Sequence, residues 1–452
     1  MRRGKIVGPA LVVSLAAAAG AQEPPPPPSP PPLEAPEPPP AVGSAPEFRW
    51  EGELKLGLRD SKDLQTPIFT PFPDRQGRLF QRTVDPGVSL ELTTVNLRGE
   101  GEITSGVHAK VEVHVLDLYN RNPTSSDDRI LVREAWLRFG DGPEPSRPGA
   151  GRTYVLVGLA PRFTKQLVRR LDSYGMLGTA VGRFEQPQVQ LGARLGSHAY
   201  ARASVGNGNP VFLRDTNALA GDNGTPDRSP GSPARVYETG LPILYDAKPA
   251  DINLDGKFEW GAGVGTRFER EEGDAVDVLL WRFQRPMSEA AKIRGTRLLG
   301  DLDLLRGEGF PLPISGRSKS EWGLNLVASR AGFRLFGQYV DQDIAGLKRR
   351  GFETELAWIH RLPGLFLIKE SPFLPWIQPA VRVSYIDNRF TVPRNFPSLS
   401  VGWDWTKYDF GLRVGLVRGV DLTVEYSRHN AFIPQRPTIH PDEWLATFRA
   451  GF

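Results

Sequence analysis

Apolar and polar residues alternate with a period of two over much of the chain, and this pattern restricts the fold more than any other feature of the sequence. Successive side chains of a β-strand point to opposite faces, so each such segment has one apolar and one polar face. Sixteen segments show the pattern, near residues 48–60, 88–104, 107–117, 130–139, 153–159, 187–195, 198–206, 257–270, 274–284, 319–329, 332–341, 351–361, 376–387, 403–417, 420–430 and 442–452. The sequence therefore predicts an all-β protein of about sixteen strands.

Several segments are nine to fourteen residues long, which is the length that a tilted strand needs to cross a bilayer. No run of 18 or more apolar residues follows the N-terminal region, so a helical membrane protein is excluded. Alternating strands of this length also occur in soluble sandwiches, where the charged face meets water. Two further features favour a transmembrane antiparallel β-barrel.

The first feature is the length of the connections. Those after even-numbered segments are mostly tight, and those after odd-numbered segments are mostly long, namely 61–87, 160–186, 207–256, 285–318 and 388–402. Short turns at one rim and long loops at the other are typical of bacterial outer-membrane barrels. Two even-numbered connections, 140–152 and 362–375, are longer than this rule predicts.

The second feature is the C-terminus, where apolar residues alternate up to the last position. Trp444, Phe448 and Phe452 lie on one parity. A closed barrel pairs its last strand with its first, because no sheet edge can stay open in lipid. The aromatic ending looks like the signal by which outer-membrane barrels are recognised for insertion. We therefore predict a barrel over residues 48–452 and contact of these three residues with the barrel-assembly machinery.

The N-terminal segment is expected to lie outside the barrel. Arg2, Arg3 and Lys5 precede an apolar run that ends in Ala-Gly-Ala, so residues 1–21 are predicted to be a secretory signal peptide. An uncleaved anchor helix would need a longer apolar core. Residues 22–47 are rich in proline and favour extended polyproline II. They form either a periplasmic linker or an untethered tail.

Composition and charge exclude several classes of function. The net charge of +4 falls to +1 when the three cations of the signal peptide are removed, which weakens the case for nucleic-acid binding. The absence of cysteine excludes disulfides and thiolate metal sites. The six histidines form no tight ligand pair, and no nucleophile motif or triad order is recognisable. We predict a protein that is not an enzyme.

One motif matches the start of a calcium-binding loop. Asp251, Asn253, Asp255 and Glu259 have the required spacing, but the twelfth position is Ala262 instead of the bidentate Glu. Clusters of Asp, Asn and Gly are also ordinary turn chemistry. These four residues are a candidate calcium site in the fourth long loop, and no other cofactor is predicted.

The third long loop, residues 160–186, carries the most distinctive chemistry. It begins with a proline and reaches a glycine at position 175, which suits a short helix. At 100° per residue, Arg162, Lys165 and Arg169 share one face. The opposite face is apolar and contains Phe163, Leu167, Leu171 and Tyr174. If that face packs on the barrel wall, the three cations point into the lumen, where clustered guanidinium groups favour anions.

Arg170 and Arg183 complete the predicted constriction and anion-binding set. Two other interpretations of the basic face remain open: it could bind the phosphates of lipopolysaccharide, or it could simply be solvated. The polar parity of the strands, which faces the lumen, carries arginines, among them Arg334 and Arg413, and glutamates in similar number. Mixed charges across a lumen orient polar solutes without fixing ion selectivity.

Two parts of the chain resemble the phosphate-selective porin O/P family. The first is the run from Tyr154 to Gly158, followed by the basic loop and the run from Arg183 to Gly192. The second is the ending, with the runs 421–427 and 443–449. The resemblance implies a trimeric, sixteen-stranded, anion-preferring channel in the outer membrane of a Gram-negative bacterium. Its partners would be lipid, lipopolysaccharide and small anionic solutes such as phosphate.

The residues alone leave two alternatives to this function. One is an outer-membrane barrel without a channel, which would act as a binding or structural protein, because barrel size does not prove an open lumen. The other is a general porin, or one that prefers cations or sugars.

Overall fold

The computed structural model describes residues 48–62, 64–67, 80–82, 87–117, 130–140, 153–166, 168–173, 175–178, 181, 185–208, 257–270, 273–287, 313–391, 404–432 and 437–452. The predicted signal peptide and linker, residues 1–47, lie outside this part of the chain. No helix within the described ranges has the length and apolar character needed to cross a membrane.

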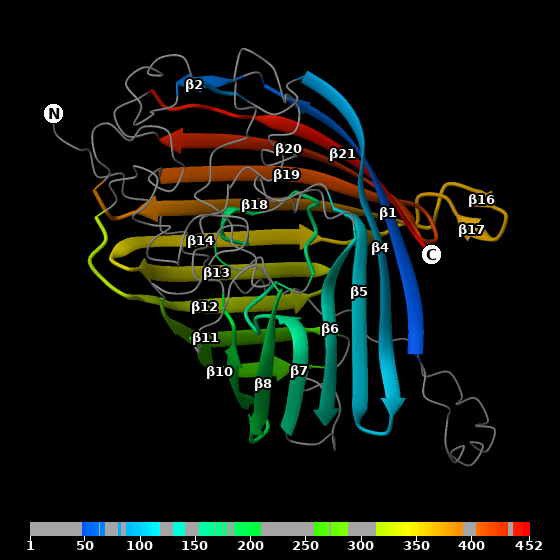
Figure 1. Ribbon diagram of the computed structural model, residues 1–452. Helices are drawn as coiled ribbons and strands as arrows, with labels where there is room; N and C mark the ends of the chain where they lie inside the picture. The colour runs from blue at the N-terminus through cyan, green and yellow to red at the C-terminus, as the bar shows by residue number, and fades with distance from the viewer. Residues whose placement is uncertain are drawn as a thin grey trace, which may run out of the picture. The chain divides into compact units, whose positions relative to one another are not determined.

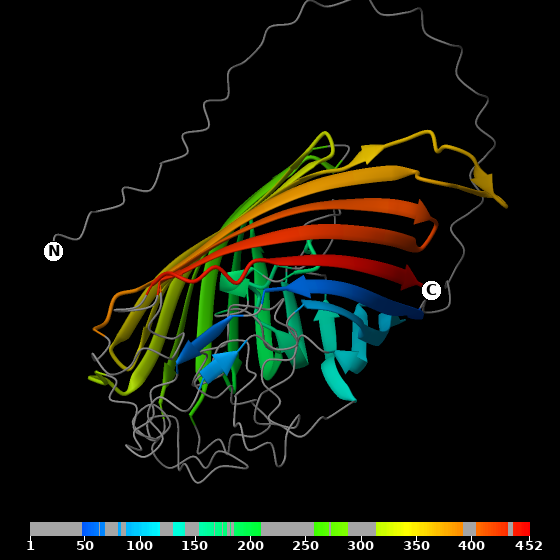
Figure 2. The ribbon, with the colours of Figure 1, turned by 90° about the horizontal axis from the view of Figure 1, so that it is seen from above.

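Sixteen antiparallel strands form a closed barrel, as predicted (Figures 1 and 2). The strands are β1 (Phe48–Ser61), β4 (Gly87–Thr104), β5 (Val107–Asp117), β6 (Leu131–Gly140), β7 (Thr153–Pro161), β8 (Glu185–Leu195), β9 (Ala199–Gly206), β10 (Glu259–Glu269), β11 (Ala275–Pro286), β12 (Ser318–Arg330), β13 (Phe333–Ile344), β14 (Leu347–Trp358) with its continuation β15 (His360–Arg361), β18 (Trp376–Asn388), β19 (Asp404–Val417), β20 (Val420–Phe432) and β21 (Glu443–Gly451). Two small hairpins lie outside the barrel sheet, β2 (Gln65–Pro67) with β3 (Phe80–Arg82) and β16 (Leu367–Ile368) with β17 (Ser371–Pro372).

Pairing of the first and last strands closes the sheet. Leu54 lies opposite Ala450 and Leu58 lies opposite Ala446 in the antiparallel register of β1 and β21. The final residue extends this pairing, because the amide of Gly52 donates to the Phe452 carbonyl over 2.7 Å and the Phe452 amide donates back over 3.0 Å. The barrel therefore has no free edge along its first or last strand.

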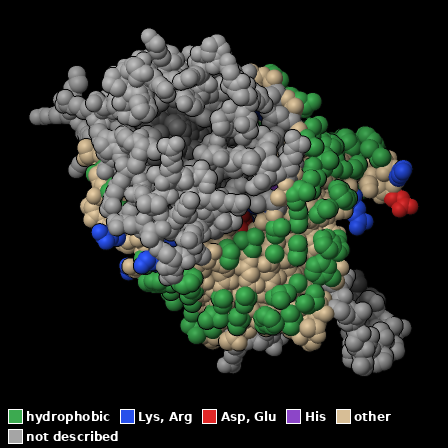
Figure 3. Space-filling view, viewed as in Figure 1, with side chains coloured by type: hydrophobic (Ala, Val, Ile, Leu, Met, Phe, Trp, Pro, Cys, Tyr) green, Lys and Arg blue, Asp and Glu red, His purple; other side chains and the backbone are tan. Residues whose placement is uncertain are grey.

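The two faces of the barrel are the reverse of those of a soluble protein. On β12, Trp322 and Leu324 are exposed on the outside, whereas Glu321 and Asn325 are buried on the inside. The same alternation continues around the wall, and hydrophobic side chains cover the outer face (Figure 3). An apolar outer band around a polar interior suits strands that cross a bilayer.

The tight turns gather at one end of the barrel, which we call the turn rim. It is formed by the connections at 105–106, 196–197, 331–332 and 418–419. The chain enters and leaves the barrel at this rim, since Phe48 begins β1 and Phe452 follows β21 there. At the opposite rim, where the sequence predicts mostly long connections, Ala345 and Gly346 join β13 to β14 in a tight turn. These two strands are therefore longer than the alternation pattern indicated.

The two long connections at the turn rim differ in what can be described. Residues 141–152 lie outside the described part of the chain. Residues 362–375 form the β16–β17 hairpin, which continues beyond the rim (Figures 1 and 2).

Candidate functional site

The loop between β7 and β8 folds into the barrel, but its described residues do not form the predicted helix. Residues 162–166 and 168–173 form turns, bends and irregular structure, and helical residues appear at 176–178 and at 181. The prediction of a helix with three cations on one face is therefore wrong for this segment. The physical reason is that side chains of the barrel wall, in place of carbonyls four residues earlier, accept hydrogen bonds from the amides of the loop.

Three glutamates of the wall accept these amide hydrogen bonds. The amide of Arg170 donates to Glu355 over 2.9 Å. The amides of Leu177 and Gly178 donate to Glu353 over 2.9 and 3.3 Å. The amides of Asp172 and Ser173 donate to the two carboxylate oxygens of Glu425, the latter over 3.1 Å. The loop is thus held along β14 and β20 by carboxylates that project inward.

Arg162 anchors the start of the loop. Its guanidinium donates to Glu259 and, over 2.5 Å, to Glu321, and all three side chains are at least 98% buried. The guanidinium also lies 4.4 Å from the centre of the Phe283 ring. Burial lowers the pKa of Arg162, but the two carboxylates outweigh it and raise the pKa above its ordinary value. Arg162 is therefore a balanced charge within the wall.

A second anchor lies near the middle of the loop. Asp172 binds Lys55 over 3.2 Å and also binds Arg449, so it connects the loop to β1 and β21. Burial raises the pKa of the Asp172 carboxyl, but Lys55 and Arg449 outweigh burial and hold it well below its usual range. Ser173 adds a contact to β18, because Arg382 donates to its carbonyl over 3.0 Å and to its hydroxyl over 2.7 Å.

Apolar side chains of the loop pack on the wall, as the sequence predicted. The Phe163 ring lies 5.0 Å from the ring of Phe283, and Leu171 is buried against Ala357 and Ala380. Leu167 and Tyr174 fall outside the described residues. On β11, Trp281 and Phe283 face inward, are buried, and pack with Phe163 of the loop.

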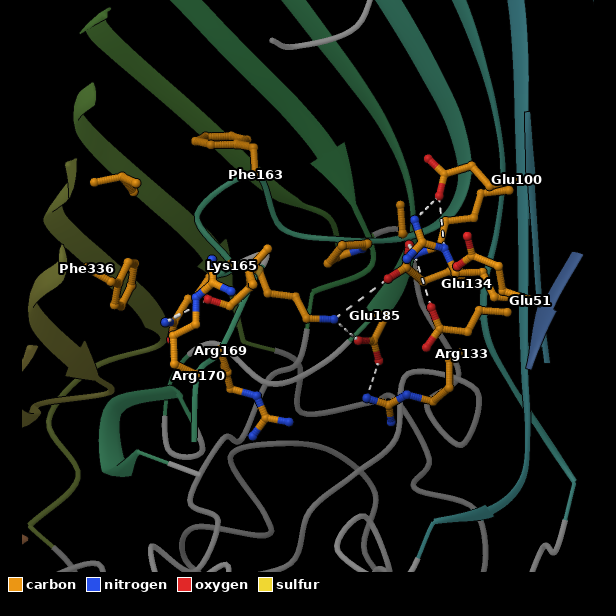
Figure 4. A pocket seen from close by; sticks show the side chains of 18 of the residues that line it. Glu51, Glu100, Arg133, Glu134, Phe163, Lys165, Arg169, Arg170, Glu185 and Phe336 are labelled. Carbon is orange, nitrogen blue, oxygen red and sulfur yellow. Dashed lines mark hydrogen bonds and ion pairs between the residues drawn. The ribbon is translucent and has the colours of Figure 1, made fainter. Parts of the chain in front are cut away.

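A cavity of 2330 Å³ extends from the inserted loop to the turn rim. Its described lining contains fifteen Lys or Arg residues and eleven Asp or Glu residues. Figure 4 shows that Arg169 and Arg170 lie on one side of this space and that Glu51, Glu100 and Glu134 lie on the other. Cations and carboxylates therefore both line the lumen, with Arg169 and Arg170 on one side and these three glutamates on the other.

Three arginines define the cationic side of the cavity. Arg170 comes from the loop, Arg334 from β13 and Arg413 from β19. Burial and the nearby charges of Arg334 and Arg413 lower the pKa of Arg170, and the Glu355 carboxylate only partly offsets them. Arg413 is held in place by two hydrogen bonds to Asp421, of 2.8 and 2.6 Å. An anion that binds between these like charges reduces the electrostatic repulsion among them.

The opposite side of the cavity is mainly acidic. Its strands β1, β4 and β5 contribute five glutamates and three cations to the lining, namely Glu51, Glu53, Glu100, Glu102, Glu112, Lys55, Arg98 and Lys110. Lys165 of the loop reaches this side and binds Glu185 over 2.7 Å, with Glu134 at 3.7 Å. Burial lowers the pKa of Lys165, but the carboxylates of Glu185 and Glu134 raise it further, so its net shift is upward. Its charge is therefore balanced by this acidic side.

The described residues of the predicted anion-binding set, Arg162, Lys165, Arg169 and Arg170, all line the cavity. Their partners differ, because Arg162 is paired with Glu259 and Glu321 and Lys165 with Glu185. Arg183 lies outside the described residues. Sequence reasoning placed Arg334 and Arg413 on the lumen parity but did not connect them with Arg170, because their strands are distant in the chain.

The candidate calcium residues Asp251, Asn253 and Asp255 lie outside the described part of the chain, and the carboxylate of Glu259 is bonded to Arg162. No group of three or more His, Cys, Asp or Glu residues suited to a metal ion occurs in the ranges that the structure describes. At the C-terminus, Trp444, Phe448 and Phe452 are exposed on the outer face.

Comparison with known proteins supports the fold. The barrel is similar to the outer membrane channel DcaP of Acinetobacter baumannii, with a TM-score of 0.51 and 11% sequence identity over 90% of this chain and 98% of that chain. OprB of Pseudomonas putida gives a TM-score of 0.45 at 8% identity, covering 90% of this chain and 94% of that one. An anion-selective porin from Comamonas acidovorans gives 0.43 at 9% identity, covering 90% and 100%.

The likeness to DcaP is a likeness of fold. No family model matches the sequence, and no curated protein matches it either. The barrel and its apolar outer face define the class as a multi-pass β-barrel of the outer membrane. The narrower resemblance to the phosphate-selective porin O/P family is not confirmed and stays a prediction.

Proposed function

We propose that this protein is a porin, a non-enzymatic outer-membrane channel through which small hydrophilic solutes diffuse passively, with a preference for anions such as phosphate and similar oxyanions. The cavity that reaches from the inserted loop to the turn rim supports a channel. The observation that carries the anion preference is the group of Arg170, Arg334 and Arg413 on one side of this cavity.

The chemistry of these arginines suits oxyanions. A guanidinium presents several N–H donors in a planar fork and binds the oxygens of phosphate or carboxylate in pairs. Inside a confined lumen, water screens charge less well than in bulk, so these arginines act on a passing ion more strongly than a surface patch would. Anions are expected to move along the side formed by the loop, β13 and β19.

The proposal also covers assembly and partners. The exposed aromatic side chains of Trp444, Phe448 and Phe452 support a role of the C-terminal strand in recognition by the barrel-assembly machinery. The apolar outer face suits contact with lipid, lipopolysaccharide and neighbouring copies of the chain, and we include a homotrimer in the proposal. We also propose that the chain begins with a signal peptide, residues 1–21, and a periplasmic linker, residues 22–47.

A general or cation-preferring porin is the second candidate. The acidic side formed by β1, β4 and β5 favours it, because its five lining glutamates outnumber the three lining cations of the same strands. With opposite charges on two sides, a field crosses the lumen and orients polar solutes. The balance between the two sides decides the selectivity.

Single-channel recording of the purified barrel in planar bilayers tests the proposal. We expect stepwise conductance and, in a salt gradient, a zero-current potential on the side of anion selectivity. A barrel that inserts without conducting would contradict the channel and support a binding or structural protein. A conducting barrel with a cation-selective potential would contradict the anion preference and support the second candidate.

A further inference from the structure

The connection between β15 and β18 leaves the barrel as an ordered hairpin. The amide of Leu365 donates to the Phe373 carbonyl over 2.8 Å, and the Phe373 amide donates to the Phe366 carbonyl over 2.7 Å. At the base, the amide of Leu374 donates to the carbonyl of Leu416 in β19, over 3.1 Å. The ribbon therefore has a fixed place beside the turn rim, from which it projects (Figures 1 and 2).

The first strand of the hairpin is apolar on both of its faces. Leu365, Phe366, Leu367 and Ile368 are 71, 57, 68 and 45% exposed. Consecutive residues of an extended strand point to opposite faces, so this run places exposed apolar side chains on each side of the ribbon. A hairpin in water, or one that packs with a single face on another protein, has a polar face; this one has none along the four residues. Its surroundings must be apolar on both sides.

The outer surface next to the hairpin indicates that lipid is this apolar medium. Phe333 stacks on Trp358 at 5.8 Å, and Trp358 lies 4.9 Å from the ring of His360. Aromatic side chains at the ends of membrane strands mark the boundary between headgroups and acyl chains. The hairpin begins two residues after His360, so it starts at the level of this boundary on the turn-rim side.

The tip and the backbone of the hairpin restrict its depth. Lys369 and Glu370 form the turn and are exposed, and Figure 3 shows charged side chains at the end of the green protrusion. Such charges stay in the headgroup layer. A two-stranded ribbon also has amides and carbonyls on its edges without partners in the sheet, which cannot lie in the hydrocarbon core. In the headgroup–acyl boundary, acyl chains can contact the apolar side chains, and headgroups and water can form hydrogen bonds with these polar groups.

We propose that residues 362–375 form an interfacial lipid anchor, in which the hairpin lies in the headgroup–acyl boundary of the leaflet at the turn rim. Acyl chains cover the face of Phe366 and the face of Leu367, while Lys369 and Glu370 lie among the headgroups. The anchor fixes the depth and tilt of the barrel at one point of its circumference.

The chain contains no cysteine, so single-cysteine variants carry a spin label at a unique site. We would label Phe366→Cys and Leu367→Cys on the two faces, Lys369→Cys at the tip, and Ser197→Cys in another turn of the same rim as the control. Each protein is reconstituted in phospholipid liposomes, and collision rates with oxygen and with a water-soluble nickel chelate are measured. Migration of the labelled barrel as a heat-resistant band verifies folding.

The anchor predicts that labels at 366 and 367 collide severalfold more with oxygen than with the nickel chelate, and that labels at 369 and 197 show the reverse. Collision with the chelate at 366 and 367 as frequent as at 197 would place the hairpin in water and overturn the proposal. Protection of only one face, with spin–spin broadening between labels, would also overturn it, because a second copy of the chain would then cover that face.

Discussion

The guanidinium of Arg162 and the carboxylate of Glu259 form a buried ion pair that joins the inserted loop to β10. Glu321 of β12 binds the same guanidinium, so two strands and the loop share one charge centre. Removal of one partner from such a centre leaves an uncompensated buried charge, which costs far more than the pair itself contributes.

We expect Arg162→Gln to destabilise the folded barrel by about 3–5 kcal/mol, because Glu259 and Glu321 lose their cation. Arg170→Gln is the matched control, since Arg170 is only partly buried and its side chain faces the cavity. The measurement is the temperature at which the compact band is lost on gels. Equal midpoints for the two variants would show that the Arg162 centre does not hold the loop.

Gly175 offers a separate test of the loop anchors. A β-carbon at this position would lie 2.0–2.1 Å from the carboxylate of Glu353. Gly175→Ala must therefore displace this carboxylate, which accepts hydrogen bonds from the amides of Leu177 and Gly178. We expect a looser loop, with a larger single-channel conductance and more current noise than in the wild type. Gly337→Ala is the control, because its nearest neighbours would lie at 3.8–3.9 Å. Identical traces from the two variants would contradict this role of Glu353.

The loop anchors also predict a pH dependence. The folded pKa of Asp172 is depressed, so its stabilising contribution is complete above the unfolded value of about 3.9 and is lost as the pH falls further, toward the folded pKa. The folded pKa of Lys165 is raised, so its contribution is complete below about 10.4 and is lost as the pH rises through the folded pKa. Both contributions are therefore constant between pH 5 and pH 9.

The unfolding midpoint of Asp172→Asn compared with the wild type checks this window. The difference between the two proteins should stay constant from pH 9 to pH 7 and should be smaller at pH 3 than at pH 7. A difference as large at pH 3 as at pH 7 would mean that the Asp172 carboxyl is not held by Lys55 and Arg449.

The C-terminal aromatic is predicted to act in assembly more than in conduction. Deletion of Phe452 removes both its ring and the two hydrogen bonds to Gly52, so we expect less folded barrel in the outer membrane. Phe452→Ala keeps the backbone bonds and removes only the ring. A normal amount of heat-resistant barrel from Phe452→Ala would reject the aromatic residue as an insertion signal and would leave only its role in closing the sheet.

The strands could be predicted from the sequence and the path of the inserted loop could not, and each result has a physical cause. The outside of the barrel meets lipid and the inside meets a polar lumen, so the polarity of a residue such as Trp322 or Glu321 indicates the face on which it lies. The segment 162–173 has a local pattern that suits a helix, but Glu355 and Glu425 bind its amides from strands that lie about 185 and 250 residues away. No local propensity contains that information.

The same limitation applies to the candidate site. The sequence identified Arg169 and Arg170 as cations of the loop, and it placed Arg334 and Arg413 on the lumen parity of their strands. The closed barrel brings Arg170 near the two strand arginines, and only the register of the whole sheet determines that proximity. Arg162 was indistinguishable from its neighbours in sequence, because its partners Glu259 and Glu321 lie on strands far along the chain.

The central claim, that arginines on the loop side of the cavity give the channel its ion preference, is tested most directly by the zero-current potential in a salt gradient. The variant Arg169→Ser, Arg170→Ser, Arg334→Ser removes three cations that line the cavity, and Arg194→Ser, Arg330→Ser, Arg361→Ser removes three near the turn rim that do not. We predict that the first variant shifts the potential toward cation selectivity and that the second leaves it near the wild-type value. Equal shifts in both, or no shift in the first, would contradict the account.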